Sequence, residues 1–110
     1  MKSYIQVTTT TETKEQAQTI AQNLVEAKLA ACVQIIGPID SIYRWKDKVE
    51  NAQEWLCLIK TQDHLYNKVA AAIKNHHPYE IPEIIAVPIV KGSKEYLQWI
   101  SEETENKTKS

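Results

Sequence analysis

Two segments of the chain carry apolar residues at the three- and four-residue spacing that is typical of one buried helical face. The first segment follows Thr13, which forms the signature of a capping box with Gln16. The second follows Asp63, a candidate N-cap, and ends before Pro78. The apolar stripes are Ala17, Ile20, Ala21, Leu24 and Val25 in the first segment, and Leu65, Val69, Ala72 and Ile73 in the second. We therefore expect two amphipathic helices.

Strand-like segments precede, separate and follow these helices. The predicted strands are residues 3–7, 29–45, 49–61 and 83–90. Pro38 interrupts the second strand and indicates a bulge, a bend or an edge position, whereas residues 55–59 are all apolar and predict burial on both faces. Ser93 opens a short last helix with apolar residues Tyr96, Leu97 and Ile100. The order βαββαβα predicts an α+β fold in which the helices are segregated from an antiparallel sheet.

The hairpin formed by the two middle strands is too long for a domain of this size. From Ala31 to Trp45 an extended strand spans roughly 50 Å at about 3.3 Å per residue, whereas a globular domain of this length is roughly 34 Å across. The hairpin tip should therefore protrude, and it carries Ile42, Tyr43 and Trp45. An exposed apolar arm with free edges invites aggregation unless another chain covers it, so we expect self-assembly.

Composition and charge narrow the function classes. The chain has 110 residues, of which 43% are hydrophobic and 25% charged, and we expect one domain over residues 1–103 with a polar tail at 104–110. A formal charge of -1 argues against nucleic acid as a partner. No apolar segment approaches the ~20 residues of a membrane span, and no signal peptide is recognisable. We expect a cytoplasmic protein without a membrane partner.

The cysteines and glycines point away from redox and phosphate-loop chemistry. Cys32 and Cys57 lie in apolar segments without the close spacing of a zinc or redox motif, which predicts buried, reduced core residues. The two glycines, Gly37 and Gly92, are too far apart for a glycine-rich phosphate loop. Since G-x-S-x-G and H-E-x-x-H motifs are also absent, we expect a binding protein and not an enzyme.

A run of histidines and carboxylates is the first candidate site. Residues 76–83 read His-His-Pro-Tyr-Glu-Ile-Pro-Glu, so that His76 and His77 end the second helix and two carboxylates lie in a turn bounded by prolines. Imidazole and carboxylate groups are ligands for copper, zinc and other divalent ions. The alternative is structural, with the histidines at the negative end of the helix dipole and the prolines directing the chain into the last strand.

The hairpin provides a second candidate group, Tyr43, Trp45, Glu54 and Lys60. Lys60 is either an exposed strand end or a basic group in a cleft between subunits, beside Glu80 or Glu83. In the latter case the cleft could bind a small anion. The candidate residues of this cleft are Tyr43, Trp45, Glu54, Lys60, Tyr79, Glu80 and Glu83.

Several segments together resemble one family: residues 28–33 (Lys-Leu-Ala-Ala-Cys-Val), 41–45 (Ser-Ile-Tyr-Arg-Trp), Glu54 with Lys60 and Thr61, and 77–83. The chain is similar to the CutA, or divalent-cation tolerance, proteins over nearly its whole length. The resemblance implies a ferredoxin-like βαββαβ subunit with an extra C-terminal helix, assembled into a homotrimer similar to the PII signalling proteins.

The resemblance also implies a role in tolerance of copper and other divalent ions, with metal ligands at His76 and His77. The family's cysteine near the end of the first strand is replaced here by Thr8 or Thr9, depending on the alignment, and thiolate is the strongest ligand for copper(I) or zinc. We therefore expect copper or another divalent cation to bind weakly. The turn after Trp45 also departs from the family, with Lys46 and Asp47 in place of the usual glycine.

Three hypotheses for function remain at this point. The leading one is a homotrimer that responds to divalent metal ions and binds them weakly through His76, His77 and nearby carboxylates. The second is a PII-like regulatory trimer whose cleft binds a small anionic ligand through Lys60, Tyr43, Trp45 and Glu80. The third is a trimer with a purely structural or partner-anchoring role.

Overall fold

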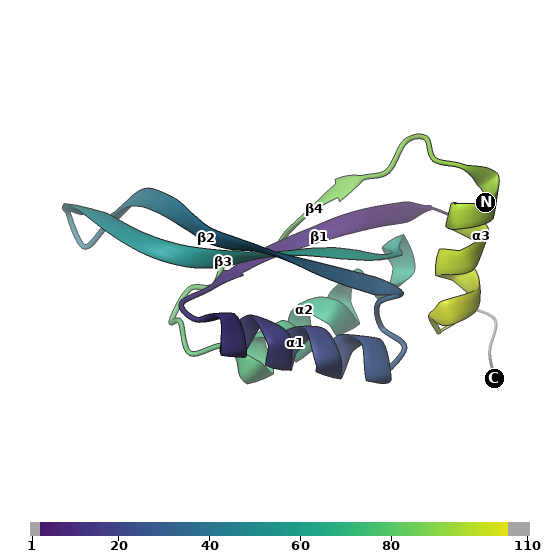
Figure 1. Ribbon diagram of the computed structural model, residues 1–110, viewed down its shortest axis with the longest axis horizontal. Coiled ribbons are helices and arrows are strands. Elements are labelled where there is room, and N and C mark those ends of the chain that lie inside the picture. Colours follow the sequence, from purple (N-terminus) through teal and green to yellow (C-terminus); the bar gives the residue numbers. More distant parts are fainter. Residues whose placement is uncertain (1–2, 106–110) are drawn as a thin grey trace.

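A computed structural model describes residues 3–105 of the chain and shows a four-stranded antiparallel sheet with three α-helices (Figure 1). The elements are β1 (Tyr4–Thr11), α1 (Lys14–Glu26), β2 (Cys32–Trp45), β3 (Lys48–Gln62), the 3₁₀ turn η1 (Asp63–Leu65), α2 (Tyr66–His76), β4 (Ile85–Pro88) and α3 (Lys94–Glu103). The strand order is β2-β3-β1-β4. This confirms the predicted α+β, ferredoxin-like fold with an additional C-terminal helix.

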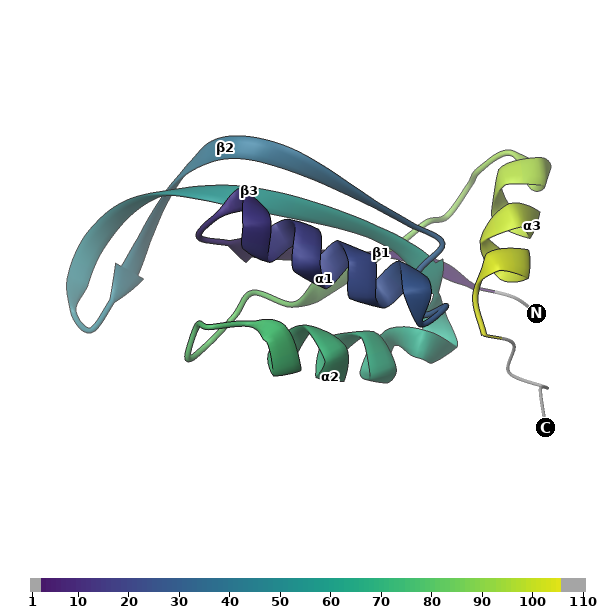
Figure 2. The ribbon, with the colours of Figure 1, turned by 60° about the horizontal axis from the view of Figure 1, so that its bottom comes forward.

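Helices α1 and α2 lie side by side on one face of the sheet, and α3 packs beyond its end (Figures 1 and 2). The core lies between these two helices and the central strands β1 and β3. Its fully buried side chains include Val7, Ile20, Leu24, Ile59, Leu65, Val69 and Ile73. Both predicted helical stripes therefore face the core, except that Val25 is exposed. Among the helices of residues 3–105, none is long and apolar enough to cross a lipid bilayer.

The two main helices begin in different ways. Thr13 and Gln16 form the predicted capping box, since the Gln16 amide donates to Thr13 Oγ1 and Gln16 Oε1 accepts from the Thr13 amide. The prediction that Asp63 caps the second helix was wrong. Residues Asp63–Leu65 form a 3₁₀ turn, and Leu65 then precedes α2 without a side-chain cap.

Two strands end elsewhere than predicted. Strand β1 continues to Thr11, because its threonines, β-branched residues that favour strands, pair with β3 as far as Trp55. Strand β4 covers only Ile85–Pro88, since residues 77–84 form a loop between α2 and the sheet.

The described part of the predicted polar tail, Thr104 and Glu105, packs against the domain. Thr104 is 2% exposed. Its hydroxyl donates to the carbonyl of Ile100 and accepts from the side-chain amide nitrogen, Nε2, of Gln62. The Glu105 amide donates to the carbonyl of Lys28. The prediction of a solvated tail from residue 104 was therefore wrong for Thr104 and Glu105, and residues 106–110 lie outside the described part of the chain.

The β2–β3 hairpin extends well past the helices, as predicted, and gives the molecule dimensions of 46 × 27 × 22 Å (Figure 2). Its pairing shifts register between Ile36 and Ile39, which confirms the bulge expected at Pro38 on an edge strand.

Residues 55–59 of β3 have completely buried side chains on one face only. Cys57 and Ile59 are completely buried under the helices, whereas Leu56 and Leu58, which alternate with them, are half-buried on the other face. Burial of residues 55–59 on both faces is therefore not achieved within this chain. Among the described residues, helices α1 and α2 leave this second face uncovered, and α3 contacts it only at one end, where Ser101 hydrogen-bonds Tyr4 and Tyr96 contacts Cys32 (Figure 1).

Gly37 provides a test of the packing at the bulge. A Cβ atom at this position would lie 2.5 Å from Cε3 of the Trp55 ring, and the ring packs against the core and cannot easily move. We expect Gly37→Ala to lower the free energy of unfolding by about 1–3 kcal/mol because of overpacking, as measured by urea denaturation. Gly92→Ala is the matched control: the three atoms nearest to its Cβ would all belong to the Leu97 side chain, at 3.1 Å or more. Equal losses for the two variants would contradict the clash.

Candidate functional site

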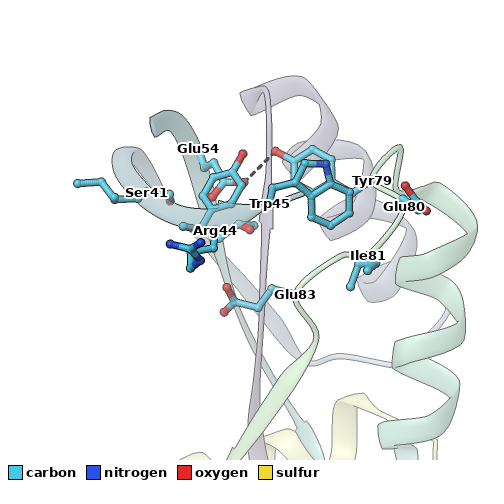
Figure 3. Close-up of a pocket in the computed structure, with 11 residues that line it drawn as sticks. Ser41, Arg44, Trp45, Glu54, Tyr79, Glu80, Ile81 and Glu83 are labelled. Carbon is cyan, nitrogen blue, oxygen red and sulfur yellow. Dashed lines mark hydrogen bonds between the residues drawn. The ribbon is translucent and has the colours of Figure 1, made fainter. Parts of the chain in front are cut away.

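A pocket of about 720 Å³ lies between the β2–β3 hairpin and the loop that joins α2 to β4 (Figure 3). The hairpin supplies Ser41, Ile42, Tyr43, Arg44, Trp45 and Glu54; the loop supplies Tyr79, Glu80, Ile81 and Glu83; and β1 supplies Thr10. By strand alternation Thr10, Glu54, Ser41, Tyr43 and Trp45 lie on the sheet face opposite α1 and α2. The pocket therefore uses the part of the hairpin that extends past the core.

His77 anchors the loop to the sheet. Its Nε2 lies 2.6 Å from the carbonyl oxygen of Thr10, and its Nδ1 accepts from the Tyr79 amide at 3.2 Å. Since a carbonyl can only accept, the proton must reside on Nε2, and the imidazole is held as one neutral tautomer. The ring centroids of His77 and Tyr79 are 4.6 Å apart. Both ring nitrogens of His77 are thus engaged within the chain.

Tyr79 and Glu54 make a second contact between the loop and the hairpin. The Tyr79 hydroxyl donates to Glu54 Oε2 at 2.8 Å (Figure 3), and Glu54 is only 7% exposed. Burial, followed by the hydrogen bond and the negative charge of Glu54, raises the pKa of Tyr79 far above its ordinary value. Tyr79 therefore remains protonated and donates to the carboxylate at every physiological pH.

Negative charge predominates in the pocket. Glu54, Glu80 and Glu83 contribute three carboxylates against the single guanidinium of Arg44, a formal net charge of -2. Partial burial raises the pKa of the Glu83 carboxyl above its ordinary value of 4.5, and the charge of Glu54 raises it further. Within residues 3–105 no ion pair joins Arg44 to any of these carboxylates. The pocket is therefore a site of unbalanced negative potential.

Six of the predicted cleft residues come together in this pocket: Tyr43, Trp45, Glu54, Tyr79, Glu80 and Glu83. Lys60 does not join them. It shares a strand face with Glu54, but six residues of extended chain separate the two by roughly 20 Å, and its ammonium donates to Gln34 Oε1. Within one subunit Lys60 therefore is not the basic group of this cleft.

The two predicted metal ligands differ in their surroundings. Helix α2 ends at His76, whose side chain is exposed and makes no hydrogen bond or ion pair within the described residues. His77, directly after the helix, turns toward Thr10 instead. Across residues 3–105, no group of three or more His, Cys, Asp and Glu side chains is arranged to hold a metal ion.

Sequence reasoning missed five lining residues, Thr10, Ser41, Ile42, Arg44 and Ile81. Ser41, Ile42 and Arg44 belong to the hairpin segment 41–45, in which Tyr43 and Trp45 were recognised, so their proximity was a usable signal. Thr10 carries no such signal, since it reaches the pocket only because β1 continues beyond Val7 and pairs with β3.

The two cysteines are not equivalent. Cys57 is completely buried, and burial raises the pKa of its thiol to about 11, so it is an unreactive core residue as predicted. Cys32 is half-buried and contacts the side chain of Tyr96. The prediction of core burial was wrong for Cys32, because its position in β2 points to the sheet face opposite α1 and α2.

Comparison with known proteins shows the family of the chain. The family model described as "CutA1 divalent ion tolerance protein" matches residues 5–103, nearly the whole described domain. The chain belongs to the CutA1 family. The "Divalent-cation tolerance protein CutA" of Thermus thermophilus is 48% identical over 95 residues, which make up 86% of this chain and 92% of that protein.

Other CutA1 relatives differ in length and in the cellular compartment given in their descriptions. The human "Protein CutA" is 46% identical over 82% of this chain, which spans only 50% of that longer protein. The solved structure of the "Periplasmic divalent cation tolerance protein CutA" from Archaeoglobus fulgidus superposes with a TM-score of 0.88 and 41% identity, covering 96% of this chain and all of that one. Because one relative is described as periplasmic, a cytoplasmic location for this chain stays a prediction.

The raised pKa of Glu83 predicts a pH effect on stability. A carboxyl whose pKa is higher in the folded state favours folding when protonated, and this contribution is lost as the pH rises through its folded pKa. We therefore expect Glu83→Gln, which cannot ionise, to raise the melting temperature at pH 7 and to match the wild type below about pH 4. Thermal unfolding from pH 3 to 8 checks this. A larger increase in melting temperature for Glu83→Gln at acidic pH than at pH 7 would contradict the predicted direction of the effect.

Proposed function

We propose that this CutA1 protein acts in the tolerance of divalent cations as a homotrimer that binds the ions weakly and catalyses no reaction. The family description and the names of the relatives support the link to divalent cations. The main support for self-assembly is that one chain covers its own sheet and hairpin only in part. Each part of the proposal has its own test.

Apolar residues that one chain cannot cover support self-assembly. On the hairpin, Ile42 is 71% exposed and Val49 is 66% exposed. At the far end of the molecule, Tyr96 and Trp99 of α3 are also exposed, with ring centroids 5.5 Å apart. Further copies of the chain would remove these surfaces from water, as in other obligate oligomers. The number three follows from the resemblance to PII-like trimers.

The oligomeric state can be measured by size-exclusion chromatography with light scattering. We expect a mass three times the 12.6 kDa of one chain. Ile42→Asp places a charge in the proposed interface and should yield smaller species, whereas Asn67→Asp, on the exposed surface of α2, should leave the trimer intact. A wild-type mass of 12.6 kDa would exclude the assembly, and identical behaviour of the two variants would exclude Ile42 from its interface.

His76 is the better of the two histidines for a metal ligand. Its imidazole is exposed and has no partner among the described residues, whereas His77 would have to release Thr10 or Tyr79 in order to bind an ion. Since one imidazole is a weak site alone, we infer that water or a carboxylate of a neighbouring subunit completes the coordination. Weak binding also agrees with threonine at the family's cysteine position.

Calorimetric titration with copper(II) and zinc(II) under reducing conditions tests the metal site. We expect weak, saturable binding that His76→Ala removes and that the double variant His76→Ala/His77→Ala also lacks. His64→Ala is the matched control, because His64 lies at the opposite end of the same helical segment and bonds the Glu105 carbonyl. Binding that persists in the double variant would exclude these histidines, and an absence of binding would favour a structural trimer.

The anion-binding alternative receives no support from the pocket. Three carboxylates line it, and Lys60, the basic residue on which that hypothesis depended, is not among the lining residues of the subunit. Among the residues that line the pocket, Arg44 is the one cation available to an anion, against three carboxylates. The metal-tolerance hypothesis therefore remains the leading one.

A further inference from the structure

The pocket contains chemistry that weak metal binding at His76 does not use. Its walls combine three aromatic rings, those of Tyr43, Trp45 and Tyr79, with the carboxylates of Glu54, Glu80 and Glu83 (Figure 3). We propose that this pocket binds a small organic dication, an aliphatic diamine, with its ammonium groups at the carboxylates and its methylenes against the rings. This site is separate from the proposed metal site, and neither depends on the other.

The buried carboxylate of Glu54 is the first argument for a cationic ligand. Its side chain lines the pocket, is more than nine-tenths buried and accepts a hydrogen bond from the neutral Tyr79 hydroxyl. No cation of the described residues forms an ion pair with it. A largely buried carboxylate is costly unless opposite charge balances it, so an ammonium group entering the pocket would supply the missing charge.

The second carboxylate explains the preference for two ammonium groups. Glu54 and Glu83 line the same pocket, and partial burial followed by the charge of Glu54 raises the pKa of Glu83, so the two carboxylates repel each other. Together with Glu80 and Arg44 they leave the formal net charge at -2. One ammonium group would balance half of this charge, whereas a diamine would balance all of it and relieve the repulsion.

The aromatic walls favour an organic cation over a bare metal ion. An ammonium group is attracted to the face of an aromatic ring, and the Lys46 ammonium already lies 5.7 Å from the centroid of the Trp45 ring. Ile81 adds aliphatic surface for methylene groups. A volume of about 720 Å³ also suits an organic ligand, and no set of three metal-binding side chains forms there among the described residues.

The test uses full-length protein, dialysed against a chelator and held in a buffer free of primary amines, and calorimetric titration with 1,4-diaminobutane. We expect saturable binding at one site per chain. Two ligands of the same chain length are the chemical controls: 1,4-butanediol, which has no charge, and succinate, which has two negative charges. Neither should bind measurably. Diol binding equal to that of the diamine, or succinate binding without diamine binding, would overturn the proposal.

Matched variants identify the pocket as the binding site. Glu54→Gln and Glu83→Gln should each weaken diamine binding by about tenfold or more, since each removes a charged contact. Glu15→Gln, the same change on the exposed first turn of α1, should leave it unaltered. Trp45→Leu should weaken binding while preserving the charge of the pocket.

Glu83→Gln and Trp45→Leu decide the outcome if Glu54→Gln fails to fold, because Glu83 is exposed at the rim and Trp45 lies near the hairpin tip. Circular dichroism of each variant separates lost binding from lost structure. Wild-type affinity in folded Glu83→Gln and Trp45→Leu proteins would overturn the proposal, as would a wild-type protein that does not bind the diamine. Loss of metal binding in His76→Ala with diamine binding intact would show that the two sites are independent.

Discussion

The β2–β3 hairpin is much longer than the helices that pack on it, and the rest of the structure depends on this difference in length. Helices α1 and α2, of 13 and 11 residues, are only about 20 Å and 17 Å long at 1.5 Å per residue. Strands β2 and β3, of 14 and 15 residues, extend for more than about 45 Å. The helices can therefore cover only part of one face of the hairpin. The rest is left to the loop after α2, to solvent, or to the further copies of the chain that we propose.

The loop from α2 to β4 covers part of this remainder and creates the pocket in doing so. Two side chains separated by one residue fix it, with His77 bound to the Thr10 carbonyl and Tyr79 to the Glu54 carboxylate. The His-Pro-Tyr segment that suggested a metal site is thus also a structural anchor. Because the anchor requires a neutral imidazole with both nitrogens occupied, the structural and metal-binding roles compete at His77 but not at His76.

Features that depend on neighbouring residues could be predicted from the sequence, whereas those that depend on distant ones could not. The capping box at Thr13 and the helical stripes follow from spacings of three and four residues, and both are present. The protruding hairpin followed from strand length alone. The position of Lys60 did not, since strand alternation assigns it to the face of Glu54 while leaving them roughly 20 Å apart. Likewise, Thr10 enters the pocket only through the pairing of β1 with β3.

The uncovered sheet face and the acidic pocket are linked by their position on the same side of the hairpin. Thr10 and Glu54 of the pocket are adjacent along their strands to Thr8 and Leu56, which belong to the face opposite α1 and α2. A neighbouring subunit that covered this face would exclude water from the pocket floor and lower its effective dielectric constant. Repulsion among the carboxylates would then increase, and so would their attraction for a cation. Assembly would therefore make the pocket more selective for positive charge, without any change in its own residues.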